Sequence, residues 1–290
     1  MAEIAVEQLR PGMVLIQDVK GVSGRPIVRK GTELTEQEIE FLKAFLIERV
    51  HVSMSTEKVQ YTSADDGQKP KEENEQESSK QLDDSFVTVY EEVVVQFKLL
   101  FRSWQANAPV KMYSIRELCL PLFELVESKE LDDITSLLQG RKSDLFYYKT
   151  VAVSLLSIKL AQLMNYKKKD WLQIGFASLL ADAGLAKTEV TIDSSQADRK
   201  HPIRSYEMIK NEPTLTDHAK LAIVQHHERL DGSGFPMQLQ ADKIHPYAQI
   251  IAVSDRYFTL LLEVGEEVYE YLKREKAKLA TDLINLFTRG

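Results

Sequence analysis

The sequence predicts a mainly α protein, in which a small α+β N-terminal domain and a polar linker precede a large all-helical domain. Three observations predict it: strand-like runs in residues 1–55, a charged segment at 56–84, and apolar side chains every three or four residues through 85–290. A chain of 290 residues with 43% hydrophobic side chains can fill one large core and one small core.

The N-terminal domain is expected to mix strands with one short helix. Thr35 and Glu38 form a capping box, in which each side chain can satisfy a free backbone N–H at the start of a helix. The strand-like runs are Met13–Val19, Pro26–Arg29 and Val50–Val52. Residues 56–84 hold almost no apolar side chains, so they cannot offset the entropy of ordering, and we predict a flexible linker.

The rest of the chain reads as a series of helices. Residues 170–181 are apolar nearly all round, which predicts a central helix, and Pro202 suits a first helical turn. A second capping box, Ser114–Glu117, is expected to start a helix that ends near Val126. Further helices are expected from Ser85 onward and at Asp144–Asn165, Leu215–Arg229, Tyr247–Glu263 and Glu267–Phe287.

Composition narrows the class of protein. A net charge of −7 argues against general nucleic-acid binding, although a few local cations can still hold a small anion. The lone Cys119 excludes an internal disulfide and is expected to be buried in a helix. The sequence starts without a signal-peptide pattern and has no apolar run near the ~20 residues of a membrane span, so we expect a cytoplasmic protein.

One stretch carries the chemistry, and it reads HHERLDGSGFP at residues 226–236. Two adjacent histidines at a helix end, before a glycine-rich turn, can aim both imidazoles at one point. Imidazole is a common ligand of zinc, iron and manganese. A histidine pair alone is more typical of a polar helix end than of a metal site, so the pair does not by itself establish a metal site.

The same stretch resembles the HHExxDGxGYP signature of the HD-GYP family, with Phe235 in place of tyrosine. The resemblance extends over roughly residues 140–265. It implies an all-helical branch of the HD superfamily of metal-dependent phosphohydrolases, whose active members hydrolyse cyclic di-GMP at a centre of two or three metals. The N-terminal domain and linker more loosely resemble an accessory region that precedes some HD-GYP domains.

The resemblance implies one nearly complete metal position. One divalent ion (iron, manganese or zinc) would be coordinated by a carboxylate and three imidazoles. The alternative is that the protein binds no metal. A late aspartate of the family falls on Asp255, in a second position that has lost its histidines. The ligands implied for the first position are Asp182, His201, His226 and His227.

The departures from the family pattern gather around the second metal position. Two residues replace metal-binding histidines, and two replace cations that neutralise the substrate phosphates. These substituted positions are Lys149, Ala181, Leu185 and Gln249. A centre that retains only Asp182 and Asp255 for its second ion lacks what two-metal hydrolysis needs.

Lys149 lies on the inward stripe of its helix, together with Val153 and Leu156. We predict that its ammonium faces Asp182 and takes the place of the missing cation beside Asp182 and Asp255, since two close buried carboxylates repel each other. The alternative is that the lysine reaches solvent along the helix surface.

The sequence therefore favours a degenerate HD-GYP protein that regulates or binds, in cyclic di-GMP-type signalling, over an enzyme. The first alternative function is an active metal-dependent phosphodiesterase, and the second alternative is a ligand-free helical scaffold. Arg204 and Arg229 are candidates to hold a phosphate, although a solvated helix face explains them equally well. Cyclic di-GMP or a signalling protein is the expected partner, and the apolar C-terminal helix leaves a homodimer open.

Overall fold

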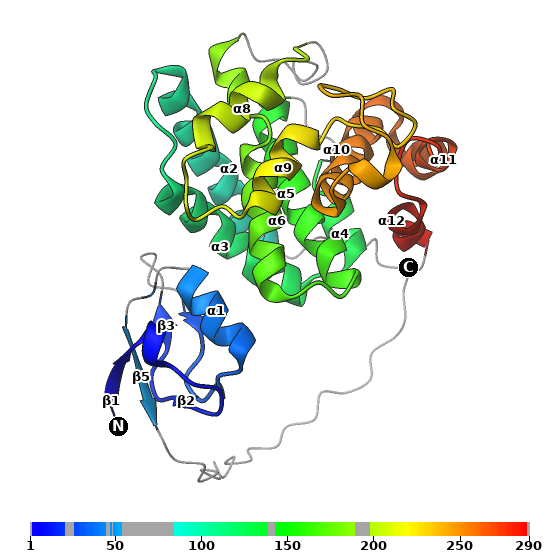
Figure 1. Ribbon diagram of the computed structural model, residues 1–290. Coiled ribbons are helices and arrows are strands. Elements are labelled where there is room, and N and C mark those ends of the chain that lie inside the picture. Colours follow the sequence, from blue (N-terminus) through cyan, green and yellow to red (C-terminus); the bar gives the residue numbers. More distant parts are fainter. Residues whose placement is uncertain are drawn as a thin grey trace, which may run out of the picture. The chain divides into compact units, whose positions relative to one another are not determined.

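The computed structural model describes residues 2–20, 26–44, 47, 49–53, 84–138, 143–188 and 198–288. Contacts divide the chain into two compact units, Met1–Asp84 and Ser85–Gly290 (Figure 1). The predicted linker, residues 56–84, lies outside the described residues except for Asp84. The predicted mainly α fold is confirmed, because the only sheets among the described residues are two small ones in the first unit.

The first unit combines a three-stranded antiparallel sheet in the order β1-β5-β2 with one helix and a two-stranded ribbon, β3-β4. Its core includes Val6, Leu34 and Leu42, none of which exposes any surface. The elements are β1 (Ala2–Ala5), η1 (Val6–Gln8), β2 (Val14–Leu15), β3 (Val19–Lys20), β4 (Pro26–Val28), α1 (Glu36–Ala44) and β5 (Arg49–Ser53).

The first capping box is confirmed, since the Thr35 backbone N–H donates to Glu38 Oε2 over 3.1 Å and the Glu38 N–H donates to Thr35 Oγ1 over 3.4 Å. The prediction of one strand over Met13–Val19 is wrong. The chain leaves the edge of β5 after Leu15 and starts the separate ribbon at Val19. The apolar pattern of a short segment does not indicate where the chain changes from one neighbouring strand to another.

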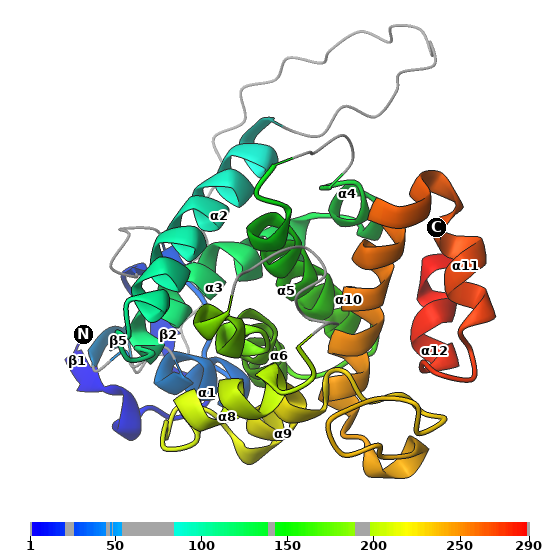
Figure 2. The same cartoon turned by 90° about the horizontal axis from the view of Figure 1, so that it is seen from above.

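The second unit consists of helices, and Figure 2 shows α10 as a long helix with α11 and α12 beside it. The helices of the first half are α2 (Asp84–Gln105), α3 (Met112–Ser128), α4 (Leu131–Thr135), α5 (Leu145–Leu163) and α6 (Lys168–Leu180). Those of the second half are η2 (Ala183–Lys187), α8 (His201–Ile209), α9 (Asp217–Gln225), η3 (Ala241–Lys243), α10 (Pro246–Val264), η4 (Gly265–Glu267), α11 (Val268–Arg274), α12 (Thr281–Ile284) and η5 (Asn285–Thr288). None of the described helices has the length and apolar character to cross a lipid bilayer.

Helices α5 and α6 form the centre of this unit and pack against each other. Every residue of α6 from Trp171 to Leu180 is buried, which confirms the central helix that its all-round apolar sequence predicted. Pro202 does lie in the first turn of α8, as predicted. The helices α5 and α10 also pack together, and they carry Lys149 and Asp255.

The bounds of three predicted helices in this unit are wrong. The helix expected at Leu215–Arg229 is α9, which runs only from Asp217 to Gln225, because the histidine pair already belongs to the turn that follows. Helix α3 begins at Met112 rather than at the Ser114 capping box, because the buried Met112 side chain extends the helix by two residues. The single C-terminal helix, Glu267–Phe287, is instead α11 and α12 with a turn between them. In that turn Glu275 binds Arg256 and the Lys278 carbonyl accepts from Leu230, and these tertiary contacts interrupt the helix.

Cys119 is buried as predicted, and we expect it to resist alkylation in the folded protein. Burial raises the pKa of its thiol to about 12, so roughly one molecule in ten thousand carries the reactive thiolate at pH 8. Iodoacetamide should therefore leave the native mass unchanged and add one adduct in guanidinium, as seen by intact mass spectrometry. Equal labelling rates with and without guanidinium would contradict the buried position.

Candidate metal centre

Four potential metal ligands converge from the ends of three helices. Asp182 follows α6, His201 is the first residue of α8, and His226 and His227 follow α9. One ligand atom from each residue lies within 4.8 Å of the others. The three histidines are buried, and the Asp182 side chain exposes 16% of its surface. The residues implied for one metal position are thus brought together.

Backbone carbonyls orient two of the imidazoles. His201 Nδ1 lies 2.7 Å from the carbonyl oxygen of Asp198, and His226 Nδ1 lies 2.8 Å from that of Ile223. A carbonyl oxygen only accepts, so each Nδ1 carries the proton and donates it. Each Nε2 is then left with its lone pair, which is the arrangement typical of metal-binding histidines.

The lone pairs point at one another. His201 Nε2 lies 3.2 Å from His226 Nε2, while Asp182 Oδ1 lies 3.0 Å from the first and 3.6 Å from the second. Three electron-rich atoms at this spacing repel unless a proton or a metal cation lies among them. The donor set of three imidazoles and one carboxylate fits a single divalent ion of the zinc, iron or manganese type.

The electrostatics of these groups favour the same forms that bind metal. Burial alone would raise the pKa of Asp182, but hydrogen bonds and the electrostatic interaction with the His201 and His226 imidazoles hold that pKa well below its usual range. Burial, together with the electrostatic effect of the neighbouring His226 and His201, lowers the pKa of His227 well below its usual value. A carboxylate and a neutral imidazole are the forms that coordinate a metal.

The turn after α9 is held by hydrogen bonds and stacking. The buried Glu228 carboxylate accepts from the backbone N–H groups of Met237 and Leu239, over 2.6 and 2.9 Å. The Phe235 ring stacks on His227, with centroids 4.7 Å apart and planes inclined by 27°. The glycine-rich turn thereby fixes the orientation of His227.

A glycine lets α8 approach Asp182. The Gly184 N–H donates to Ser205 Oγ over 2.8 Å, and a Cβ at Gly184 would lie 2.4 Å from the His201 carbonyl oxygen. A side chain would therefore push the start of α8 away. The close approach of η2 and α8 is what places His201 against Asp182.

Lys149 reaches the site, but its partner differs from the predicted one. Its Nζ lies 2.7 Å from Asp255 Oδ1, with the two side chains exposing only 8% and 7% of their surface. The prediction that Lys149 faces Asp182 is wrong in this respect, because α5 packs on α10 and presents the ammonium to Asp255. The alternative that the lysine reaches solvent is excluded by its burial.

The space between these groups is small. A cavity of about 10 Å³, room for about one water molecule, is lined by Lys149, Ala181, Asp182, His226 and Asp255 among others. Asp255 Oδ2 has no hydrogen-bond partner among the described residues. The ammonium therefore takes up much of the room beside the two carboxylates.

Comparisons with known proteins agree with this geometry. The HD domain family profile matches residues 126–269. The cyclic di-GMP phosphodiesterase PdeB of Borreliella burgdorferi is 29% identical over 124 residues, and the cyclic di-GMP phosphodiesterase response regulator RpfG of Xanthomonas campestris pv. campestris is 34% identical over 74 residues. The chain belongs to the HD-GYP family.

The matched segments cover 43% and 25% of this chain, and 29% and 20% of those two HD-GYP relatives, so the chain spans well under half of their lengths. The solved structure of Bd1817, a HDG"Y"P protein from Bdellovibrio bacteriovorus, is similar with a TM-score of 0.59 and 16% identity. That match covers 100% of this chain and 99% of Bd1817, and it supports the fold alone.

Neither of the expected phosphate-neutralising cations has a charged replacement in this HD-GYP protein. Leu185 is fully buried in η2, and Gln249 donates to the Ile244 carbonyl oxygen over 2.9 Å. Ala181, at the end of α6, is buried and contributes a methyl group to the cavity beside Asp182. At none of these three positions does the side chain carry charge or a metal-binding nitrogen.

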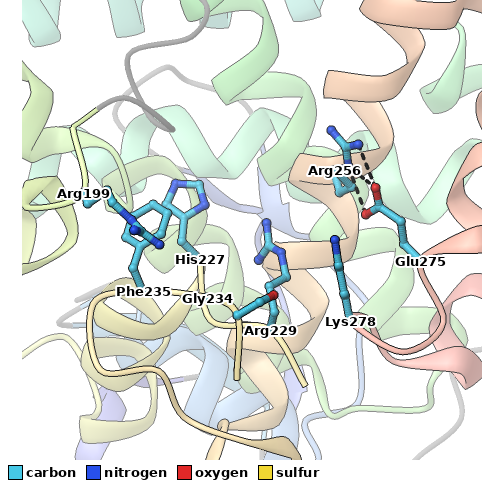
Figure 3. A pocket seen from close by; sticks show the side chains of 9 residues that line it. Arg199, His227, Arg229, Gly234, Phe235, Arg256, Glu275 and Lys278 are labelled. Carbon is cyan, nitrogen blue, oxygen red and sulfur yellow. Dashed lines mark hydrogen bonds and ion pairs between the residues drawn. The ribbon is translucent and has the colours of Figure 1, made fainter. Parts of the chain in front are cut away.

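The two arginines proposed to hold a phosphate have different surroundings. Arg204 donates to the Gly184 carbonyl oxygen and pairs with Asp198, so its charge is already neutralised. Arg229 instead lines an open cavity of about 450 Å³ next to His227 (Figure 3). Sequence analysis missed Arg256 and Lys278, which line the same cavity, because no local pattern links them to the histidine motif.

Proposed function

We propose that this protein is a catalytically impaired HD-GYP module that regulates or binds in cyclic di-GMP-type signalling and does not hydrolyse the messenger. The 2.7 Å ion pair between Lys149 and Asp255 carries this proposal. An ammonium bound to the aspartate repels a second metal cation and occupies its space. A centre without a second ion cannot clamp and activate a bridging hydroxide.

One divalent ion is the proposed cofactor. Asp182, His201, His226 and His227 would hold it, since their ligand atoms already lie within 4.8 Å of one another. Such an ion supplies Lewis acidity toward a phosphate oxygen. The protein's own groups bind and orient: the carbonyls of Asp198 and Ile223 fix two imidazoles, and the carboxylate balances the ion's charge.

The relatives support the signalling class, because both named curated relatives are cyclic di-GMP phosphodiesterases. The uncharged Leu185 and Gln249 support binding over hydrolysis, since a phosphodiester in the transition state needs its charge neutralised. Cyclic di-GMP or a protein of that signalling system is the proposed partner. Asp255 is proposed to pair with Lys149 instead of binding a metal ion.

Metal analysis and a turnover assay test this function. The purified chain should hold about one divalent ion, because one position has four ligands and the other holds an ammonium. Incubation with cyclic di-GMP and manganese or iron should yield no linear or hydrolysed product by chromatography. His226→Ala should lower the metal content, with exposed His218→Ala as the matched histidine control. Two ions per chain, or hydrolysis that His226→Ala abolishes, would refute the proposal.

A further inference from the structure

We infer that the cavity between the histidine turn and the C-terminal helices is a separate binding site for a small phosphate-bearing anion. We call this cavity the cation pocket. Among the described residues, its unpaired cations are Arg199, Arg229 and Lys278. The site goes beyond the proposed function, because it needs no metal. It also extends past the family match at residue 269, since Glu275 and Lys278 form one of its walls.

The charge of the pocket is strongly unbalanced. Among the described lining residues, four are cationic and only Glu275 is acidic. Glu275 is taken by Arg256, whose Nε lies 2.9 and 3.0 Å from the two carboxylate oxygens and whose Nη2 lies 2.7 Å from one of them. That pair is neutral, so the cation pocket keeps an excess of positive charge that attracts an anion.

Arg229 is oriented for this role. Its Nη1 donates to the carbonyl oxygens of His226 and Glu228, over 3.3 and 2.8 Å. Figure 3 shows the guanidinium between His227 and Lys278, pointing into the cavity. The Arg229 side chain is half-buried, so its guanidinium is partly shielded from water. A partly desolvated guanidinium gains from a bound phosphate, whose oxygens match its N–H groups.

The walls of the pocket are fixed before any ligand binds. The Leu230 N–H donates to the Lys278 carbonyl oxygen over 2.9 Å, which ties the histidine turn to the turn between α11 and α12. On the opposite side, the Arg199 guanidinium lies 5.0 Å from the centre of the Phe235 ring. Prearranged cations lower the entropic cost of binding.

The size and charge of the pocket select the ligand class. About 450 Å³ lies in the range of small-molecule sites and is far smaller than a protein interface. Separate cations around one cavity suit an anion with several charged oxygens, such as a phosphate or pyrophosphate group, better than a single carboxylate. Because Phe235 stacks on His227, a ligand here lies next to the proposed metal position.

Calorimetric titration of inorganic pyrophosphate into the full chain tests the site. Metal is first removed with a chelator, because pyrophosphate also coordinates divalent ions. We expect one pyrophosphate per chain and an affinity about tenfold lower or more in Lys278→Glu, since a charge-assisted contact becomes a repulsion. Lys276→Glu, which makes the same charge change at an exposed residue outside the pocket, should bind like the wild type.

Arg199→Gln provides a second variant at the opposite wall and should also weaken binding. The absence of pyrophosphate binding to the wild type, or equal affinities in Lys278→Glu and Lys276→Glu, would overturn the inference. Metal content and cyclic di-GMP turnover should be the same in Lys278→Glu as in the wild type. Failure of the cation pocket is thus distinguishable from failure of the proposed function.

Discussion

Lys149→Met is expected to lower the free energy of unfolding by about 3–5 kcal/mol, because it leaves a buried carboxylate without its cation. Lys149 and Asp255 expose only 8% and 7% of their side chains, so solvent screens this pair very little. Asp255 Oδ2 already lacks a hydrogen-bond partner among the described residues, so nothing nearby compensates the lost ammonium. Methionine preserves most of the length of the aliphatic stem and removes the ammonium.

Urea denaturation of the metal-free protein measures this effect. Lys210→Met breaks an exposed ion pair with Glu207 and should leave the unfolding midpoint unchanged, which controls for loss of a lysine. The double variant Lys149→Met, Asp255→Asn should recover much of the loss, since it removes the unpaired charge as well. A Lys149→Met protein as stable as the wild type would show that the ion pair does not replace a missing cation.

Gly234→Ala is expected to destabilise the protein by about 3 kcal/mol or more and to reduce its metal content. A Cβ at this position would lie 2.4 Å from the Arg229 nitrogen, 2.5 Å from the Glu228 Cα and 2.5 Å from the His227 carbonyl oxygen. All three are backbone atoms, so no side-chain rotation relieves the clash. The turn must shift, and it carries His227 with it.

Thermal denaturation and metal analysis of the same preparation check both effects. Ser233→Ala, at the exposed neighbouring residue, should change stability by less than about 0.5 kcal/mol and keep the metal. If Gly234→Ala kept both its stability and its metal, the close approach of the turn to the histidines would not matter for the site.

The variants Lys149→Met and Gly234→Ala distinguish two structural contributions to the same site, charge compensation and ligand positioning. Lys149 stabilises the Asp255 carboxylate, which is not one of the four proposed ligands, whereas Gly234 positions a proposed ligand. Lys149→Met should therefore reduce stability without removing the proposed single ion, and Gly234→Ala should affect both. This pattern follows from a centre in which a protein cation and a metal ion occupy adjacent positions.

Local sequence determined the helical class of this protein, and the resemblance of residues 226–236 to the HD-GYP signature implied the residues of its histidine cluster. The all-round apolar pattern of residues 170–181 specified a central helix, since such a helix is stable only inside a core. The histidine–glycine stretch at 226–236 specified a turn beside two imidazoles, because both features depend on neighbouring residues.

Tertiary structure alone decided the partner of Lys149, the break between α11 and α12, and the cation pocket. Lys149 meets Asp255 only because α5 packs on α10, and Lys278 joins the pocket through the Leu230 hydrogen bond. The physical reason is that periodicity and capping act within a few residues. The distance between charges far apart in the sequence depends on how whole helices pack.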